Sequence, residues 1–317
     1  MTDTQNEVFK TPVNKIRLFE HGAPGSQNLK LTRKYYTEDM PDGRVKHIVQ
    51  NITDPDIVPY IPDGIGNSTD RQRIPAVLII PGGAFRRLVY NFEGEDVAKW
   101  LNSMGIAAFV LECRLPSDEH DNAEDVPLID AMRAMRVIRG RAQEFGIDEA
   151  KIGVMGFSAG GFMAALLSTA YESDVYADYK YKDEYDKLSA RPDFAVCSYP
   201  VISIDDCIEA GKRYMSEEQV LERISGSKAK ILHKYNPDKL VRPDMPPVFI
   251  CETDDDRTTL SENSVGFYMA VRKAGVSAEL HIFRTGGHGY GCGDDFAQTG
   301  EWKVLFTKWI KSIGIIS

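Results

Sequence analysis

Apolar residues gather into short, nearly continuous runs along most of the chain. These runs cover residues 74–80, 106–111, 151–155, 194–199, 248–251 and 278–283. Runs of this length with few polar interruptions are typical of strands buried on both faces, as in a parallel sheet. Six such strands would supply the core of an α/β domain.

Between the runs the spacing of apolar residues becomes helical. Residues 128–145 carry apolar side chains at Leu128, Met132, Met135 and Ile138, which share one helix face. The same reasoning predicts helices over residues 94–103, 261–274 and 301–310. Regular alternation of strand and helix predicts a mostly parallel central sheet with helices on both faces.

Three stretches depart from this alternation. Residues 1–70 carry short alternating runs between turn clusters, which predicts antiparallel N-terminal strands. Residues 204–245 are polar and helical and are too long for a loop, so we expect a small helical insertion over the carboxyl edge of the sheet. Residues 171–188 hold five tyrosines among charges and are a candidate lid loop, with a solvated loop as the alternative. No linker divides the chain, which predicts one domain over residues 1–317.

The motif G-x-S-x-G occupies residues 156–160, between a predicted strand and a predicted helix. This arrangement is typical of a nucleophile elbow, in which a serine stands on a tight turn above the sheet. The glycines leave room for the neighbouring strand and helix. The pattern predicts Ser158 as the nucleophile and the Ala159 amide as an oxyanion donor at a helix N-terminus.

A serine nucleophile needs a base and an orienting acid, which follow it in this order on later strands of an α/β-hydrolase: acid, then histidine. His288 lies after the last predicted strand, between glycines, and is the only one of six histidines with that order and setting. The acid should follow residues 248–253, where Asp254, Asp255 and Asp256 are consecutive. Spacing alone does not choose among the three.

A second oxyanion donor is expected from the loop after an earlier strand. Residues 81–84 read Pro-Gly-Gly-Ala and directly follow the apolar run of residues 74–80. Glycines let the backbone approach a substrate and turn amide groups toward it. The alternative is a plain turn.

The overall charge narrows the range of partners. The chain has 38 basic and 47 acidic residues and a formal net charge of −9, which argues against a nucleic-acid partner.

Five cysteines without a C-x-x-C pair favour a reducing compartment. The first ten residues are polar and no apolar run reaches the length of a membrane span, so we expect a cytoplasmic protein with no membrane partner. The oligomeric state cannot be read from the sequence.

The motifs taken together resemble the acetyl esterase and acetylxylan esterase-like α/β-hydrolases, often grouped with feruloyl-esterase-like and endo-xylanase-associated enzymes. The resemblance extends over nearly all of residues 15–315. It is carried by Pro81-Gly82-Gly83-Ala84-Phe85, Phe92-Glu93-Gly94-Glu95, Cys113-Arg114-Leu115-Pro116, Gly156-Phe157-Ser158-Ala159-Gly160-Gly161, Arg191-Pro192-Asp193, Pro246-Pro247, Thr253-Asp254-Asp255-Asp256 and Gly286-Gly287-His288-Gly289-Tyr290-Gly291.

The resemblance implies roles for particular residues. The family's acid is the first of an Asp-Asp pair after Thr-Ala, which places Asp255 in the acid position and Asp254 in that of the alanine. It implies Gly83 and Ala84, together with Ala159, as oxyanion donors. The chain departs from the family where Arg257 replaces the usual valine after the pair. It also has Ala84 where three glycines are common, which adds a methyl group near the acyl site.

These observations predict a serine carboxylesterase that hydrolyses short acyl esters, with O-acetyl groups on carbohydrates of the xylan type as the expected substrate. No cofactor and no metal are expected. Alternatives are a feruloyl or other small-ester hydrolase, a prolyl-peptidase-like hydrolase on the same triad, and a non-catalytic binding module. The ligand-rich run of residues 118–121 raises a metal hydrolase as a further alternative, with a solvated loop as its simpler explanation.

Overall fold

The computed structural model describes residues 9, 13–64, 73–223, 226–293 and 298–317. Its centre is an eight-stranded sheet in which β5, β7, β8, β9, β10 and β11 run parallel, and β4 and β1 continue the sheet antiparallel at one edge. In spatial order the strands are β1 (Ile16–Arg17), β4 (Asp56–Tyr60), β7 (Ala107–Glu112), β5 (Ile74–Ile80), β8 (Ile147–Phe157), β9 (Ala195–Ser198), β10 (Val248–Thr253) and β11 (Ala278–Phe283).

The burial of each strand follows its composition. Every residue of β7, β9 and β10 is buried, and β5 is buried after its first residue. Strand β11 reads Ala-Glu-Leu-His-Ile-Phe and is only partly buried, because it lies at the edge of the sheet. The mostly parallel sheet predicted from the apolar runs is confirmed.

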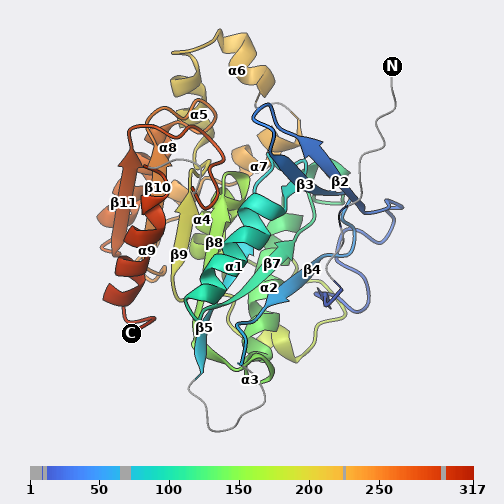
Figure 1. Cartoon of the computed structure of the whole chain (residues 1–317). Helices are drawn as coiled ribbons and strands as arrows, with labels where there is room; N and C mark the ends of the chain where they lie inside the picture. Colours follow the sequence, from blue (N-terminus) through green and yellow to red (C-terminus); the bar gives the residue numbers. More distant parts are fainter. Residues whose placement is uncertain (1–8, 10–12, 65–72, 224–225, 294–297) are drawn as a thin grey trace.

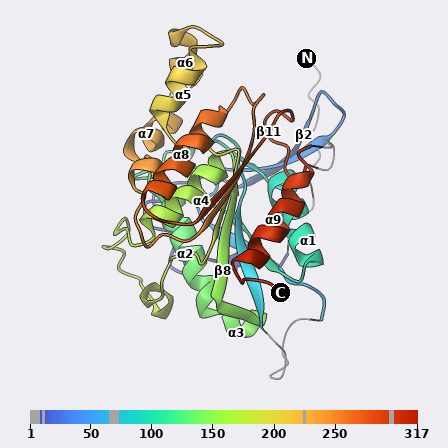
Figure 2. The ribbon, with the colours of Figure 1, turned by 90° about the vertical axis from the view of Figure 1, so that its left-hand side faces the viewer.

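Helices cover both faces of the sheet, as Figure 2 shows with β8 between the two layers. One layer holds α1 (Asp96–Ser103) and α9 (Glu301–Ser312), which meet through the rings of Trp100 and Trp302, 4.9 Å apart. The other layer holds α2 (Val126–Gly140), α4 (Ala159–Ala170) and α8 (Ser261–Lys273). The short α3 (Ala142–Phe145) leads into β8. Helix α4 is apolar and buried along nearly its whole length, which fixes the serine turn that precedes it.

The antiparallel N-terminal strands divide into two groups. Strands β1 and β4 extend the main sheet, whereas β2 (Lys34–Asp39), β3 (Val45–Gln50) and β6 (Leu88–Val89) form a separate three-stranded sheet. Strand β6 directly follows the Pro-Gly-Gly-Ala loop and pairs with β3. The small sheet therefore lies beside this loop, at the end of the molecule toward which the parallel strands run (Figure 1).

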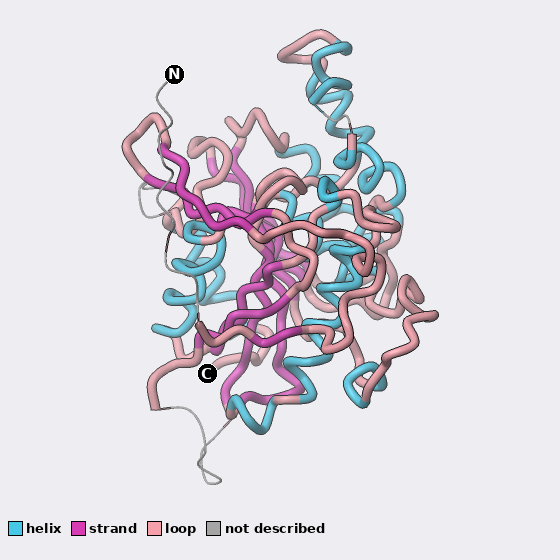
Figure 3. The backbone as a smooth tube through the Cα atoms, turned by 90° about the vertical axis from the view of Figure 1, so that its right-hand side faces the viewer, coloured by secondary structure: helices cyan, strands magenta, loops and turns pink. Residues whose placement is uncertain are grey.

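The insertion forms helices at the same end of the molecule. It contains α5 (Ile204–Gly211), α6 (Glu217–Arg223), α7 (Ser227–Lys234) and the short 3₁₀ turn η4 (Pro237–Lys239). Figure 3 shows α6 and the β2–β3 hairpin projecting on opposite sides of this end. Between them lie the loops that follow the parallel strands.

Residues 171–188 lie away from the insertion and pack on α2. Their 3₁₀ turn η3 (Glu184–Lys187) packs on α2, and the Tyr185 ring lies against Gly140, the last residue of α2. Tyr176 and Tyr179 contact the ring of Phe19. Because α2 runs antiparallel to the strands, its last residue lies toward the amino edge of the sheet. The candidate lid loop is thus packed on α2 in this structure.

Candidate active site

Ser158 stands on the turn between β8 and α4 with a backbone φ of 54° and ψ of −117°. This left-handed conformation is rare for a residue with a side chain and projects the hydroxyl away from the sheet. A Cβ on Gly156 would overlap the Gly160 carbonyl, and one on Gly160 would overlap the Ile80 carbonyl. The two glycines are therefore steric requirements of the turn. The serine is only 8 % exposed.

His288 reaches the serine from the loop after β11. Its Nε2 lies 2.9 Å from Ser158 Oγ, and its Nδ1 lies 2.6 Å from Asp256 Oδ2. Because a carboxylate only accepts, Nδ1 carries the proton in this contact and Nε2 turns a lone pair toward the serine. The Thr259 hydroxyl donates to the same Asp256 oxygen at 3.0 Å and fixes the carboxylate further.

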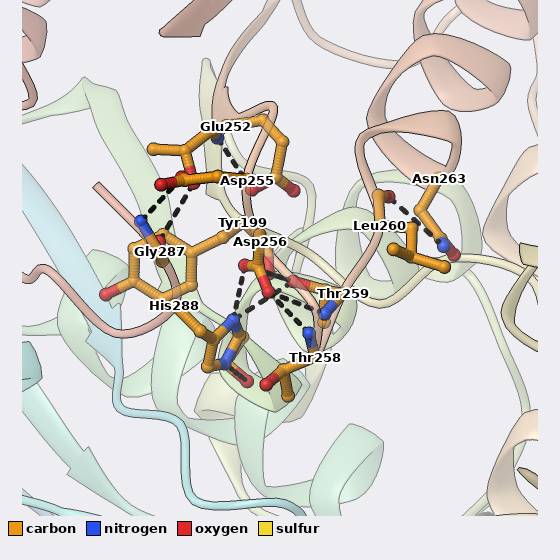
Figure 4. Close-up of polar contacts among 12 residues, drawn as sticks. Tyr199, Glu252, Asp255, Asp256, Thr258, Thr259, Leu260, Asn263, Gly287 and His288 are labelled. Carbon is orange, nitrogen blue, oxygen red and sulfur yellow. Dashed lines mark hydrogen bonds and ion pairs between the residues drawn. The ribbon is translucent and has the colours of Figure 1, made fainter. Parts of the chain in front are cut away.

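The expected contact between Asp255 and His288 is wrong, because Asp256 occupies that place (Figure 4). Asp256 is 1 % exposed, and its Oδ1 accepts the amides of Thr258 at 2.6 Å and Thr259 at 3.0 Å. Asp255 points the other way, where its Oδ1 accepts the Gly287 amide at 2.8 Å. One carboxylate thus faces the imidazole, while its neighbour holds the loop that carries it.

The sequence around Asp256 contains a local indication that this residue, and not Asp255, faces His288. An aspartate whose carboxylate accepts amides two and three residues later is held in a turn of its own. Asp256 is followed by Arg257, Thr258 and Thr259, and the Thr259 hydroxyl adds a contact that an apolar residue could not make. Asp254 is exposed, and its amide donates to the Phe283 carbonyl at 2.8 Å, in line with the strand pairing.

A second buried carboxyl lies behind Asp256. Glu252, in β10, accepts the Ser264 hydroxyl at 3.2 Å and the Thr253 amide at 2.9 Å. Burial, and next the negative charge of Asp256, raise the pKa of Glu252 well above its usual range. The neutral form of Glu252 is thereby favoured beside the aspartate that faces His288.

The Pro-Gly-Gly-Ala loop adopts a conformation that presents its backbone. Gly83 has a φ of 138°, and Ala84 and Phe85 have φ values of 58° and 61°. The Gly82 carbonyl accepts the Val89 amide at 2.9 Å, and the Gly83 carbonyl accepts the Arg86 amide at 3.2 Å. Among the described residues, no loop hydrogen bond uses the amides of Gly83 or Ala84. They remain available to a ligand beside Ser158.

Glu93, in the motif Phe92-Glu93-Gly94-Glu95, is a site residue that sequence reasoning missed. The side chain is 5 % exposed, and its Oε2 accepts the Gly82 amide at 2.8 Å. Its Oε1 accepts the Tyr199 hydroxyl at 2.9 Å, and that hydroxyl accepts the Gly291 amide at 3.1 Å. Glu93 therefore links the Pro-Gly-Gly-Ala loop to the histidine loop.

Burial and the neighbouring groups shift the pKa of Glu93 in opposite directions. Burial raises the pKa of Glu93, while the nearby His288 and the two donated hydrogen bonds act in the opposite direction. The signal in the sequence was an acidic residue inside the mostly apolar stretch of residues 88–94. A buried acid of this kind needs partners, and both partners prove to belong to the site.

One cavity opens at Ser158 and His288, and a second cavity adjoins it. Ser158 and His288 line a cavity of about 240 Å³. A neighbouring cavity of about 440 Å³ shares Ala84 and Thr258 with it. The insertion contributes Cys207, Gly211, Met215 and Val220 to the larger cavity. The helical insertion thus forms a wall beside the site, as expected from its place in the sequence.

Comparison with known proteins decides the family. A family model described as BD-FAE matches residues 65–271, well over half of the chain. The chain belongs to the BD-FAE family. A solved acetyl ester-xyloside bifunctional hydrolase from Caldicellulosiruptor lactoaceticus is 34% identical, with a TM-score of 0.72 over 96% of this chain and 97% of that one. The expected α/β-hydrolase fold is confirmed.

Two curated proteins are similar to this BD-FAE chain. It is 31% identical over 240 residues to an acetylxylan esterase of Xylanibacter ruminicola, and 31% identical over 227 residues to an endo-1,4-beta-xylanase B of Butyrivibrio fibrisolvens. The matches cover 75% and 71% of this chain, but only 45% and 34% of those proteins. The matched region thus spans less than half the length of either relative. The names of the esterase relatives agree with the expected class, a carboxylic ester hydrolase.

The ligand-rich run of residues 118–121 contains a buried histidine in this BD-FAE member. His120 is buried, and its Nδ1 lies 3.0 Å from the Ser26 hydroxyl. Burial, with the charge of Arg114 second, lowers the pKa of His120 to about 4. Within the described ranges, no three His, Cys, Asp or Glu side chains gather in a way that could hold a metal ion. A search of the same residues finds no helix long and apolar enough to span a membrane.

Proposed function

We propose that the chain is a serine carboxylesterase that cleaves short acyl esters, with O-acetyl groups on carbohydrates as the substrate class. The observation that carries this proposal is the hydrogen-bonded line from Asp256 through His288 to Ser158. It supplies an orienting acid, a base with its lone pair toward the hydroxyl, and a nucleophile on a tight turn that lines a cavity.

The first half of the reaction forms an acyl-enzyme. Ser158 Oγ bonds to the ester carbonyl carbon while its proton passes to His288 Nε2, and the carbonyl oxygen becomes an oxyanion. The amides of Gly83, Ala84 and Ala159 stabilise this oxyanion, each by about 3 kcal/mol. The intermediate then breaks its bond to the alcohol oxygen, which leaves with the proton from Nε2.

The second half releases the acid. Water gives a proton to His288 Nε2 and bonds to the acyl carbon, and the oxyanion forms again at the same amides. When the bond to Ser158 Oγ breaks, that oxygen recovers the proton and the carboxylic acid departs. Through both halves Asp256 keeps the Nδ1 proton in place and stabilises the imidazolium.

Preference for small acyl groups is supported by two observations. Ala84 puts a methyl group in the loop beside Ser158, where both cavities meet. The relatives named acetylxylan esterase and acetyl ester-xyloside hydrolase point to acetylated sugars as the alcohol side. We therefore expect acetyl esters to be cleaved faster than butyryl or feruloyl esters.

The experiment is steady-state hydrolysis of p-nitrophenyl acetate and of acetylated xylooligosaccharides by the wild type and Ser158→Ala. Loss of both activities in the variant, with no effect of EDTA on the wild type, is the expected result. Equal turnover by both proteins would refute the serine mechanism. Loss on EDTA treatment would favour a metal hydrolase, and faster cleavage of a prolyl amide than of the ester would favour a peptidase.

A further inference from the structure

The cavity at Ser158 and the larger cavity beside it are lined by more basic than acidic residues, unlike the chain as a whole. The whole sequence has a formal net charge of −9. Two carboxylates, Glu93 and Glu222, lie among the cavity-lining residues. The basic residues that line the cavities are Arg44, Lys46, Arg86, Arg87 and Arg257. The local excess of positive charge is therefore opposite to that of the protein.

Within the described residues, the buried Glu93 forms no ion pair with these cations. Glu93 turns both oxygens inward, to the Gly82 amide and the Tyr199 hydroxyl. Two of the cations are paired outside the cavities, Arg44 with Asp42 at 2.8 Å and Arg87 with Glu38 at 2.6 Å.

Three of the cations have no ion-pair partner within the described residues: Lys46, Arg86 and Arg257. Lys46 contributes to lowering the pKa of the buried Glu93, so its charge is felt at the site. Arg86 and Arg257 are exposed and line the larger cavity. Arg257 lies over the Tyr214 ring, 5.9 Å from its centre, which holds it at the rim. Unpaired cations that line these adjoining cavities favour an anionic ligand.

The volume of the cavities indicates which part of the ester would carry the negative charge. An acetyl group has only three non-hydrogen atoms, whereas cavities of about 240 and 440 Å³ have the volume of sites for larger ligands. The alcohol part of the ester must therefore occupy most of this space. The cations that line it would meet substituents on the alcohol.

We propose that the preferred substrates are acetyl esters whose alcohol part carries a carboxylate, as in an acetylated sugar acid. This inference rests on the proposed esterase function and narrows its substrate class. The three unpaired cations attract and orient the carboxylate, and the amides of the Pro-Gly-Gly-Ala loop bind the acetyl carbonyl. Because these cations are solvated, the preference must weaken as salt screens them.

The test compares two esters that differ in one group. A methyl glucuronide monoacetylated at one hydroxyl carries a carboxylate at C6, and the methyl glucoside acetylated at the same hydroxyl carries a neutral CH₂OH. We expect kcat/KM to favour the glucuronide roughly tenfold near 10 mM ionic strength, and less than about threefold in 0.5 M NaCl.

Variants assign the preference to particular residues. Arg86→Gln and Arg257→Gln should each lower the glucuronide-to-glucoside ratio of kcat/KM roughly two- to fivefold, and the double variant should lower it further. Lys308→Gln is the matched control. It makes the same change in net charge at an exposed position of α9, which lines neither cavity, and should leave the ratio unchanged.

A wild-type ratio at or below one would overturn the proposal, as would a preference that persists in the double variant and in high salt. Turnover of neither ester would instead refute the esterase function. In that event, calorimetric titration of Ser158→Ala with the same two esters decides the charge preference without turnover. Tighter binding of the glucuronide supports the proposal, and equal binding overturns it.

Discussion

Replacing Asp256 by asparagine changes one atom and should remove most of the activity. The asparagine oxygen would keep accepting the amides of Thr258 and Thr259, since these already meet Oδ1. The new NH₂ group would then face His288 Nδ1, where the carboxylate Oδ2 now lies at 2.6 Å. A donor there forces Nδ1 to accept and moves the ring proton to Nε2. The imidazole would turn a hydrogen, not a lone pair, toward Ser158.

The magnitude follows from the loss of the base. The equivalent change in a serine protease triad lowers kcat by about 10⁴ through the same wrong tautomer, equivalent to about 5.5 kcal/mol of barrier. We expect a loss of roughly 10³ to 10⁴ for Asp256→Asn, because Asp256 is fully buried and no other carboxylate meets Nδ1 among the described residues. Asp255→Asn is the matched control. It leaves an oxygen to accept the Gly287 amide, so its loss should stay below about threefold.

The assay is the kcat for p-nitrophenyl acetate at pH 8, with urea unfolding of each variant to show that it is folded. The reasoning is refuted if Asp255→Asn loses as much activity as Asp256→Asn. It is also refuted if folded Asp256→Asn keeps more than a tenth of the wild-type kcat.

Three further changes probe the surroundings of the triad. Glu93→Gln replaces one of the two carboxylate oxygens that accept the Gly82 amide and the Tyr199 hydroxyl. It should lower kcat/KM for p-nitrophenyl acetate about tenfold. Gly160→Ala places a Cβ against the Ile80 carbonyl and should lower the free energy of unfolding in urea by about 3 kcal/mol or more. His120 has its pKa lowered in the fold to about 4, so the unfolded chain binds more protons and wild-type stability should fall from pH 6.5 to pH 4. His120→Gln should reduce this fall by about 1–3 kcal/mol.

Each of these expectations can fail on its own. Unchanged kinetics in Glu93→Gln would show that the contact between Glu93 and the Gly82 amide does not position the Pro-Gly-Gly-Ala loop. An unfolding midpoint in Gly160→Ala equal to that of the wild type would show that the elbow tolerates a side chain. A His120→Gln protein with the same loss of stability between pH 6.5 and pH 4 would assign that loss to other groups, and exposed His21→Gln serves as the control for a change of histidine count.

The central sheet, Ser158 and His288 were accessible from sequence because each depends on a local pattern. Apolar runs indicate buried strands whatever their neighbours are. The elbow glycines belong to a recognisable short motif, although one of them is required by the Ile80 carbonyl of the neighbouring strand β5. His288 could be chosen by its order in the chain together with its setting between glycines after a strand. The structure brings both side chains within hydrogen-bond distance.

The remaining features depend on contacts between distant segments. Asp255 and Asp256 differ only in which way the turn after β10 directs them, and resemblance to the family selected the residue that holds Gly287. The role of Glu93 appears only when the loops carrying Gly82 and Gly291 lie on either side of it. The separate β2–β3–β6 sheet likewise depends on a two-residue strand that no periodicity could reveal.

The central claim is that His288, held by Asp256, activates Ser158. A fluorophosphonate reacts covalently with such a serine, so peptide mapping after labelling locates the nucleophile, and the labelling rate measures its activation. The account predicts one label per chain, on Ser158, formed at least about a thousandfold more slowly in His288→Gln. A label on another residue, or an unchanged labelling rate in folded His288→Gln, would contradict it.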